Sequence, residues 1–160
     1  MAADMFLKLG DIKGESKDHK HKNEIEIVAW SWGLTNSGSA HHGGGAGSGR
    51  VSVQDITVTK WTDLSSPAIV NAVAVGKHIP TVELYVRKAG ENPLEYLVIT
   101  MSEVLVTSIS LGGSGGEDRL TENVSLNFAK FKIQYTEQLD TGGAGSKPEF
   151  GFSVRENHPV

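Results

Sequence analysis

The chain has 160 residues, enough to bury one sizeable core and too few for two domains of ordinary size, so we expect a single domain over residues 1–160. It contains no cysteine, which excludes disulfides, thiolate metal ligands and a cysteine nucleophile. With 15 Lys and Arg against 19 Asp and Glu, the net charge of −4 disfavours a nucleic-acid partner. The first residues, MAADMFLKLGDIKG, hold no apolar run of the length that a signal peptide or membrane helix needs, so we expect neither a cleaved leader nor membrane insertion.

Alternating apolar residues predict strands along most of the chain. In chain order, these predicted strands cover residues 5–12, 24–33, 51–58, 81–90, 95–111, 124–135 and 149–157. In three of them the apolar positions slip by one residue, which predicts β-bulges or sharp bends near Val28, Gln54 and Ala129. Bends of this kind let a strand pass from one sheet to another, as the closure of a barrel requires. The long segment 95–111 is either two strands or one bent strand.

The segment TDLSSPAIVNAVAVGKH, residues 62–78, differs in kind from the strands. Ser66 suits an N-cap, Pro67 suits the first helical position, and Gly76 suits a helix stop. We therefore predict one short helix in an otherwise β protein.

Glycine is concentrated in three clusters, at residues 43–49, 112–116 and 142–145. The stretch from Gly44 to Val51 approaches a phosphate-binding loop, but Arg50 and Val51 stand where Lys and Ser or Thr belong. The residues that follow are strand-like, whereas a phosphate loop opens a helix. The pattern therefore disfavours nucleotide binding, and we expect no cofactor.

The chain shows no recognisable metal or catalytic motif. His19, His21, His41 and His42 fall in predicted loops without carboxylate or thiolate ligands at a recognisable spacing, so we interpret them as solvated. The basic run KDHKHK at 17–22 is likewise interpreted as a solvated turn. The serine of the loop GGSGGEDRLTEN at 112–123 stands beside carboxylates, which we interpret as a turn with capping groups, and we predict no catalytic residue.

Two tryptophans in the second predicted strand predict the direction of the side chain of Ser31, which lies between them. Trp30 and Trp32 are two residues apart and so share one face of the strand. Two adjacent Trp on one face are typical of a core, which turns Ser31 to the outside of the barrel.

Five stretches, taken together in their order and spacing along the chain, carry a resemblance to a known family. They are MFLKLGDIKGES, IEIVAWSWG, TKWTDLSSPAIVNAVAVGKH, VELYVRKAG and RLTENVSLNFAKFKIQY. Together they resemble the haemolysin-coregulated protein (Hcp) family of type VI secretion systems. The resemblance implies a small closed β-barrel of two sheets, with one short α-helix and an extended hairpin loop. It also implies a non-enzymatic protein whose hexameric rings stack into a tube. The tube would be fired by a contractile sheath, tipped by a spike protein, and able to carry small effector proteins.

Within that picture, the residues suggest candidate sites. Ser31 is the candidate for the lumen, since a small polar side chain leaves an open, wet bore. The glycines are interpreted as the tip of an arm over residues 35–59 that reaches another subunit, because Gly permits positive φ and close backbone approach. The candidates for contacts between subunits and stacked rings are His41, His42, Gly43, Gly44, Gly45, Gly47, Gly49, Arg50, Glu117, Asp118 and Arg119. The alternative to a tube subunit is a monomeric β-barrel enzyme or ligand-binding module.

Overall fold

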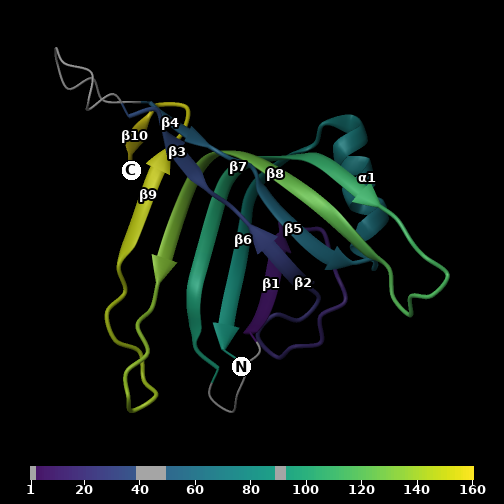
Figure 1. Cartoon of the computed structure of the whole chain (residues 1–160), viewed down its shortest axis with the longest axis horizontal. Helices are drawn as coiled ribbons and strands as arrows, with labels where there is room; N and C mark the ends of the chain where they lie inside the picture. Colours follow the sequence, from purple (N-terminus) through teal and green to yellow (C-terminus); the bar gives the residue numbers. More distant parts are fainter. Residues whose placement is uncertain (1–2, 39–49, 89–92) are drawn as a thin grey trace.

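The computed structural model describes residues 3–38, 50–88 and 93–160, as ten strands and one helix (Figure 1). The helix α1 spans Ser65–Val75. The strands are β1 (Ala3–Leu9), β2 (Ile25–Ser31), β3 (Leu34–Asn36), β4 (Val51–Val53), β5 (Ile56–Trp61), β6 (His78–Lys88), β7 (Glu95–Leu111), β8 (Thr121–Tyr135), β9 (Glu149–Ser153) and β10 (His158–Pro159).

Six antiparallel strands close into a barrel because β8 pairs on one side with β5 and on the other with β7. The order around the barrel is β8, β5, β2, β1, β6 and β7. Beyond it, β9 and β10 extend the sheet from the second half of β8, and β3 pairs with β4 in a separate two-stranded hairpin. This arrangement confirms the expected mainly β fold with a closed barrel, one short helix and a hairpin.

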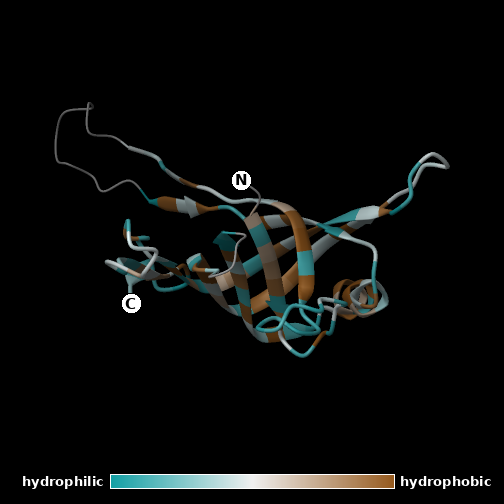
Figure 2. Cartoon of the chain, turned by 90° about the horizontal axis from the view of Figure 1, so that it is seen from below, coloured by the Kyte–Doolittle hydropathy of each residue, from teal (hydrophilic) through white to brown (hydrophobic). Residues whose placement is uncertain are grey.

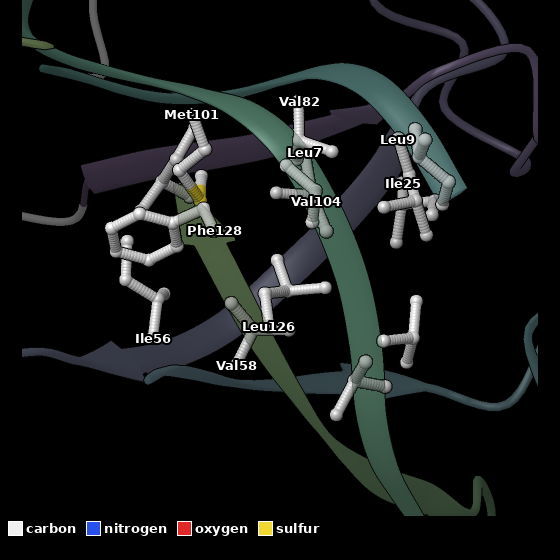
Figure 3. Close-up of a cluster of buried hydrophobic side chains, with 14 of the residues drawn as sticks. Leu7, Leu9, Ile25, Ile56, Val58, Val82, Met101, Val104, Leu126 and Phe128 are labelled. Carbon is white, nitrogen blue, oxygen red and sulfur yellow. The ribbon is translucent and has the colours of Figure 1, made fainter. Parts of the chain in front are cut away.

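The interior of the barrel is an apolar core supplied by alternate residues of every barrel strand (Figure 3). Burying each Val, Leu or Ile side chain contributes about 1.5–3 kcal/mol. Val82, Leu84 and Val86, which alternate along the strand predicted over residues 81–90, are all buried. The labelled core residues in Figure 3 are Leu7, Leu9, Ile25, Ile56, Val58, Val82, Met101, Val104, Leu126 and Phe128.

The three predicted slips have three different causes. A register shift between Ile27 and Ala29 confirms the bulge near Val28. At Gln54 there is no bulge, because β4 ends at Val53 and β5 begins at Ile56. The arm predicted over residues 35–59 is therefore too long, since β5 already belongs to the barrel.

Near Ala129 the buried face of β8 changes without a shift in register. The pairs Ser102–Lys130 and Val104–Phe128 keep one register on either side of it. Glu103 on the neighbouring strand has a positive φ of 54°, so β7 turns its buried face at the same point. The true register shift in β7 lies between Val106 and Ser108, and residues 95–111 form one bent strand.

The helix is where the sequence predicted it, but its start is different. Ser66 is not the N-cap: it lies in the first turn, buried, while the backbone N–H of Ser65 donates to Oδ1 of Asp63 at 2.8 Å. Asp63 therefore satisfies a free N–H at the helix start. At the other end Gly76 takes φ 64°, as the predicted stop requires.

A polar network that the sequence analysis missed fixes α1 to the barrel. Lys60 and Glu122 are both fully buried and form an ion pair. The ammonium of Lys60 also donates to the carbonyl of Trp61 at 2.8 Å, and Ser66 donates from the helix to Oε1 of Glu122 at 2.7 Å. Thr62 donates to the second carboxylate oxygen at 3.2 Å.

The turn predicted at residues 17–22 is solvated at Lys17, His19, Lys20 and Lys22, which are exposed, but not at His21. His21 is buried, stacked on Phe6 with ring centroids 4.5 Å apart, and bonded to Glu24 and Glu95. The interpretation of His21 as a solvated histidine is therefore wrong. The cause is the barrel surface beneath it, where Phe6 and Tyr85 offer an aromatic platform.

Candidate assembly surfaces

Ser31 is exposed at the end of β2, and the barrel register places it in a surface of small uncharged side chains. The first row across β2, β5, β8 and β7 is Ser31, Thr57, Ser125 and Ser108. The second row, in the same strand order, is Ala29, Thr59, Asn123 and Ser110. We call these eight residues the hydroxyl face. They lie on the outside of the barrel, because they alternate with core residues such as Val58 and Val124 or with residues packed against the core, such as Trp30 and Ile109.

Side chains of the hydroxyl face bond to one another rather than to charged groups. The hydroxyls of Thr57 and Ser125 lie 3.3 Å apart, and Thr59 donates to Oδ1 of Asn123 at 2.7 Å. These cross-strand pairs hold the side chains flat against the sheet. The result is a smooth polar surface without an ionised group in its two rows.

The opposite outer face of the barrel, over β1, β6, β7 and β8, is charged. Its middle row runs from Lys8 to Glu83 and Thr100 and ends at Lys132. Lys132 forms an exposed ion pair with Glu149 of β9, at 3.2 Å. We call this row and Glu149 the charged face. One small barrel thus presents two chemically different walls.

Two strand segments on the flanks of the hydroxyl face have a free edge within the described part of the chain. β1 pairs with β2 only at Ile25 and Glu26, so residues 29–31 are paired on the β5 side alone. β6 pairs with β7 no further than Leu105, so residues 107–111 are paired on the β8 side alone. Unpaired backbone donors and acceptors at such edges are ready to pair with another chain.

The candidate contact residues divide between two ends of the molecule. His41, His42, Gly43, Gly44, Gly45, Gly47 and Gly49 lie outside the described residues. Arg50 is exposed immediately before β4. Glu117, Asp118 and Arg119 lie in an exposed loop between β7 and β8, at the end of the molecule opposite the β3–β4 hairpin (Figure 2). The guanidinium of Arg119 covers the ring of Trp61 at 4.2 Å from its centroid.

Neither a metal centre nor a membrane helix is present in the ranges that the structure describes. No group of three or more His, Asp or Glu is placed there to hold a metal ion. None of the helices in those ranges has the length and apolar character to span a membrane.

The sequence identified one residue of the hydroxyl face and missed the other seven. Ser31 was found because two Trp side chains flank it. The alternation of β5 and β8 could have identified four more of these residues, because Thr57, Thr59, Asn123 and Ser125 alternate with core residues. That these strands are neighbours, and in which register, is tertiary information.

The structure thus combines a closed barrel, one neutral wall, one charged wall and, beside the neutral wall, strand edges that are open to pairing with another chain. A family model described as "Type VI secretion system effector, Hcp" matches residues 6–135. The chain belongs to the Hcp family of type VI secretion proteins, which are secreted and are not enzymes.

Comparison with individual proteins agrees with this assignment. The chain is 55% identical to Protein hcp1 of Pseudomonas aeruginosa strain PAO1 over 98% of each chain. A structure described as a type six secretion system protein superposes with a TM-score of 0.93 at 30% identity, covering 99% of this chain and all of the other. Hcp1 from Salmonella typhimurium gives a TM-score of 0.82 at 38% identity over the whole of both chains.

Proposed function

We propose that the protein is the subunit of a type VI secretion inner tube, in which six copies close into a ring and rings stack. The hydroxyl face lines the bore, and small effector proteins travel in it. The strongest support is the hydroxyl face itself, which spans the four strands β2, β5, β8 and β7 and carries no charge. A neutral wall of short side chains leaves space and water beside a passing protein without holding it by ion pairs.

The lateral contacts of the ring use the two free edges. The edge at residues 107–111 of one protomer meets residues 29–31 of the next, which continues the four-stranded sheet around the ring. The inner side of this sheet is packed with core, so only its hydroxyl face is available to line a hole. Contacts between different surfaces related by rotation close into a ring.

The remaining partners follow from this orientation. The charged face of the barrel then points away from the axis, towards the contractile sheath, and the spike protein sits on the last ring. Arg50 and the loop with Glu117, Asp118 and Arg119 are exposed, and they are the contacts proposed between stacked rings. The protein is held in the bacterial cytoplasm until firing and then reaches the outside or a target cell.

The solution mass of the purified protein tests the ring. We expect a particle near six times the 17.1 kDa chain mass, with annular projections in electron microscopy. A particle near 17.1 kDa at high concentration and physiological salt would favour the alternative, a monomeric enzyme or ligand-binding module.

A unique thiol tests the bore, because the natural chain has no cysteine. Ser31→Cys in stacked rings should react with a small maleimide and be protected from a maleimide on a large polymer. The matched control, Lys8→Cys on the charged face, should react with both. Equal reaction of both thiols with the large reagent would contradict the assignment of Ser31 to the bore.

A further inference from the structure

The helix α1 presents an exposed surface without a single charged residue. Surface helices normally carry charged side chains on the side away from the core. Here the sequence from Ser65 to Val75 is SSPAIVNAVAV, and Figure 2 shows most of the ribbon in the colour of hydrophobic residues. Val75 is 66% exposed and Val70 is 42% exposed. We call the exposed side of α1 the helix face; it is made of Pro67, Ala68, Val70, Ala74 and Val75, with Asn71 as its one polar residue.

The opposite end of the molecule carries an exposed aromatic surface. Phe150 and Phe152 of β9 lie beside Ile133 and Phe131 of β8, on one side of the extended sheet. Phe150 remains 48% exposed and so does Tyr135, two residues beyond Ile133 on the same side. We call Ile133, Tyr135, Phe150 and Phe152 the aromatic face. Exposed aromatic residues of this kind are enriched at protein interfaces.

The two faces cannot cover one another within a chain. In Figure 1, α1 lies at one end of the long axis, beside the end of β7, and β9 lies at the other end with the β3–β4 hairpin. A contact between these two faces therefore requires two molecules.

Each face lies at the same end of the molecule as one free strand edge. α1 packs on β7 and lies at the end where residues 107–111 have their free edge. The aromatic face lies at the end where β2 runs into β3, next to the free edge of residues 29–31, and Trp32 there stacks edge-on against Phe131 with centroids 4.9 Å apart.

We infer that the helix face of one protomer docks on the aromatic face of the next copy of this chain, as the outer seal of the ring contact. The inference rests on the proposed ring and adds to it. When the two free edges meet, the same approach brings α1 of one protomer to β9 of its neighbour. The short Ala and Val side chains let the helix approach the flat rings closely. One head-to-tail contact then buries both apolar surfaces, six times around the ring.

The test uses one charge on each face. Val75→Arg changes the helix face at a position where a cation suits the helix C-terminus, and Phe150→Arg changes the aromatic face. Either variant alone should lose the hexamer and run near the 17.1 kDa chain mass in sedimentation, with wild-type circular dichroism. Thr81→Arg, an exposed change on β6 away from both faces, should stay hexameric. Val70→Arg and Tyr135→Arg replace either variant that fails to fold.

Mixing the two variants gives the decisive result. Val75→Arg keeps an intact aromatic face and Phe150→Arg keeps an intact helix face, so the mixture can make one contact and no more. We expect dimers near twice 17.1 kDa that contain one chain of each kind.

Three results would overturn the inference without contradicting a hexameric ring of the wild type. The first is that both single variants remain hexameric. The second is that one variant, unmixed, forms dimers, and the third is that the mixture stays monomeric although both variants are folded. Hexamers of Phe150→Arg would indicate that another part of the same chain covers the aromatic face. A monomeric wild type would instead contradict the proposed function itself.

Discussion

Arg87 and Asp18 show how single side chains attach a loop to the barrel. Arg87 is almost fully buried, donates to Oδ2 of Asp18 at 3.0 Å, and lies 5.0 Å above the ring of Phe6. The hydrogen bond from Arg87 is the main reason that the pKa of Asp18 lies below its ordinary value of 3.8. This pair holds the connection between β1 and β2 against β6.

The depressed pKa of Asp18 predicts a pH dependence of stability. A carboxyl group whose pKa is lower in the folded state stabilises it above the unfolded pKa, and this stabilisation is lost as pH falls through the folded value. The wild type should therefore resist urea better than Asp18→Asn above pH 3.8, with the difference shrinking below it. Urea midpoints across this range measure the effect. Asp11→Asn, at an exposed carboxyl, should show no such trend, and parallel curves for Asp18→Asn and wild type would contradict the prediction.

The buried pair Lys60 and Glu122 is expected to be sensitive to single changes and tolerant of a double change. Lys60→Met leaves Glu122 without its counterion in the core, which costs about 3–5 kcal/mol of the free energy of unfolding. Glu122→Leu should cost less, because the carboxylate of Asp63, 3.1 Å from Nζ of Lys60, remains as a partner. The double variant should lose much less, because apolar residues of similar volume often replace a buried ion pair without loss. Denaturant unfolding of all four proteins measures this, and additive losses would contradict it.

Among the elements, α1 ends at a glycine for a conformational reason. Gly76 has φ 64° and no atom near the position of a Cβ, so an alanine there meets backbone strain but no clash. Gly76→Ala should lower the free energy of unfolding by about 1 kcal/mol. The matched control is Gly115→Ala, at a glycine with equally open surroundings and no positive φ, which should be neutral. Equal thermal midpoints for the two variants would contradict the explanation.

The elements also show what alternation in a sequence reveals. The positions of the helix and of the main strands were predictable because each has a local pattern of apolar residues, as in Val82, Leu84 and Val86 of β6. The buried His21 was not predictable, since its partners Glu95 and Tyr85 come from distant strands. Lys60 continues the alternation of Ile56 and Val58. Its burial was not predicted, because a charged residue on the core side is unusual and its partner lies far away in the sequence.

For the whole molecule, the contact between stacked rings should depend on salt while the ring itself does not. Arg50, Glu117 and Asp118 are exposed charges, and exposed ion pairs contribute only about 0–1 kcal/mol each. Raising the ionic strength from about 0.01 M to 1 M shortens the screening length from about 30 Å to 3 Å. Tubes should therefore separate into rings of unchanged diameter, as seen by electron microscopy. Glu117→Gln with Asp118→Asn should give separate rings at low salt, and tubes that lengthen with salt would contradict the proposal.

The candidate surfaces were harder to predict than the fold, because a surface is made by strands far apart in the chain. Ser31 belongs to the hydroxyl face, and most of the other residues of this face come from β5, β7 and β8. Only the register of these strands brings the residues together. The free edges at 29–31 and 107–111 likewise depend on where pairing with β1 and β6 stops.

The closure of the barrel by β8 also makes the folded barrel depend on the last part of the chain. β8 is the last barrel strand in the chain, and it pairs with β5, β7 and β9 at once. Without β8, the strands β1, β2, β5, β6 and β7 lack the strand that joins β5 to β7, so the barrel cannot close. Pairings between such distant segments are slow to form, because the entropy of closing a long loop comes before the contact. A chain truncated before β8 would also lack Asn123 and Ser125 of the hydroxyl face, so in the proposed ring it could not continue the sheet to its neighbour.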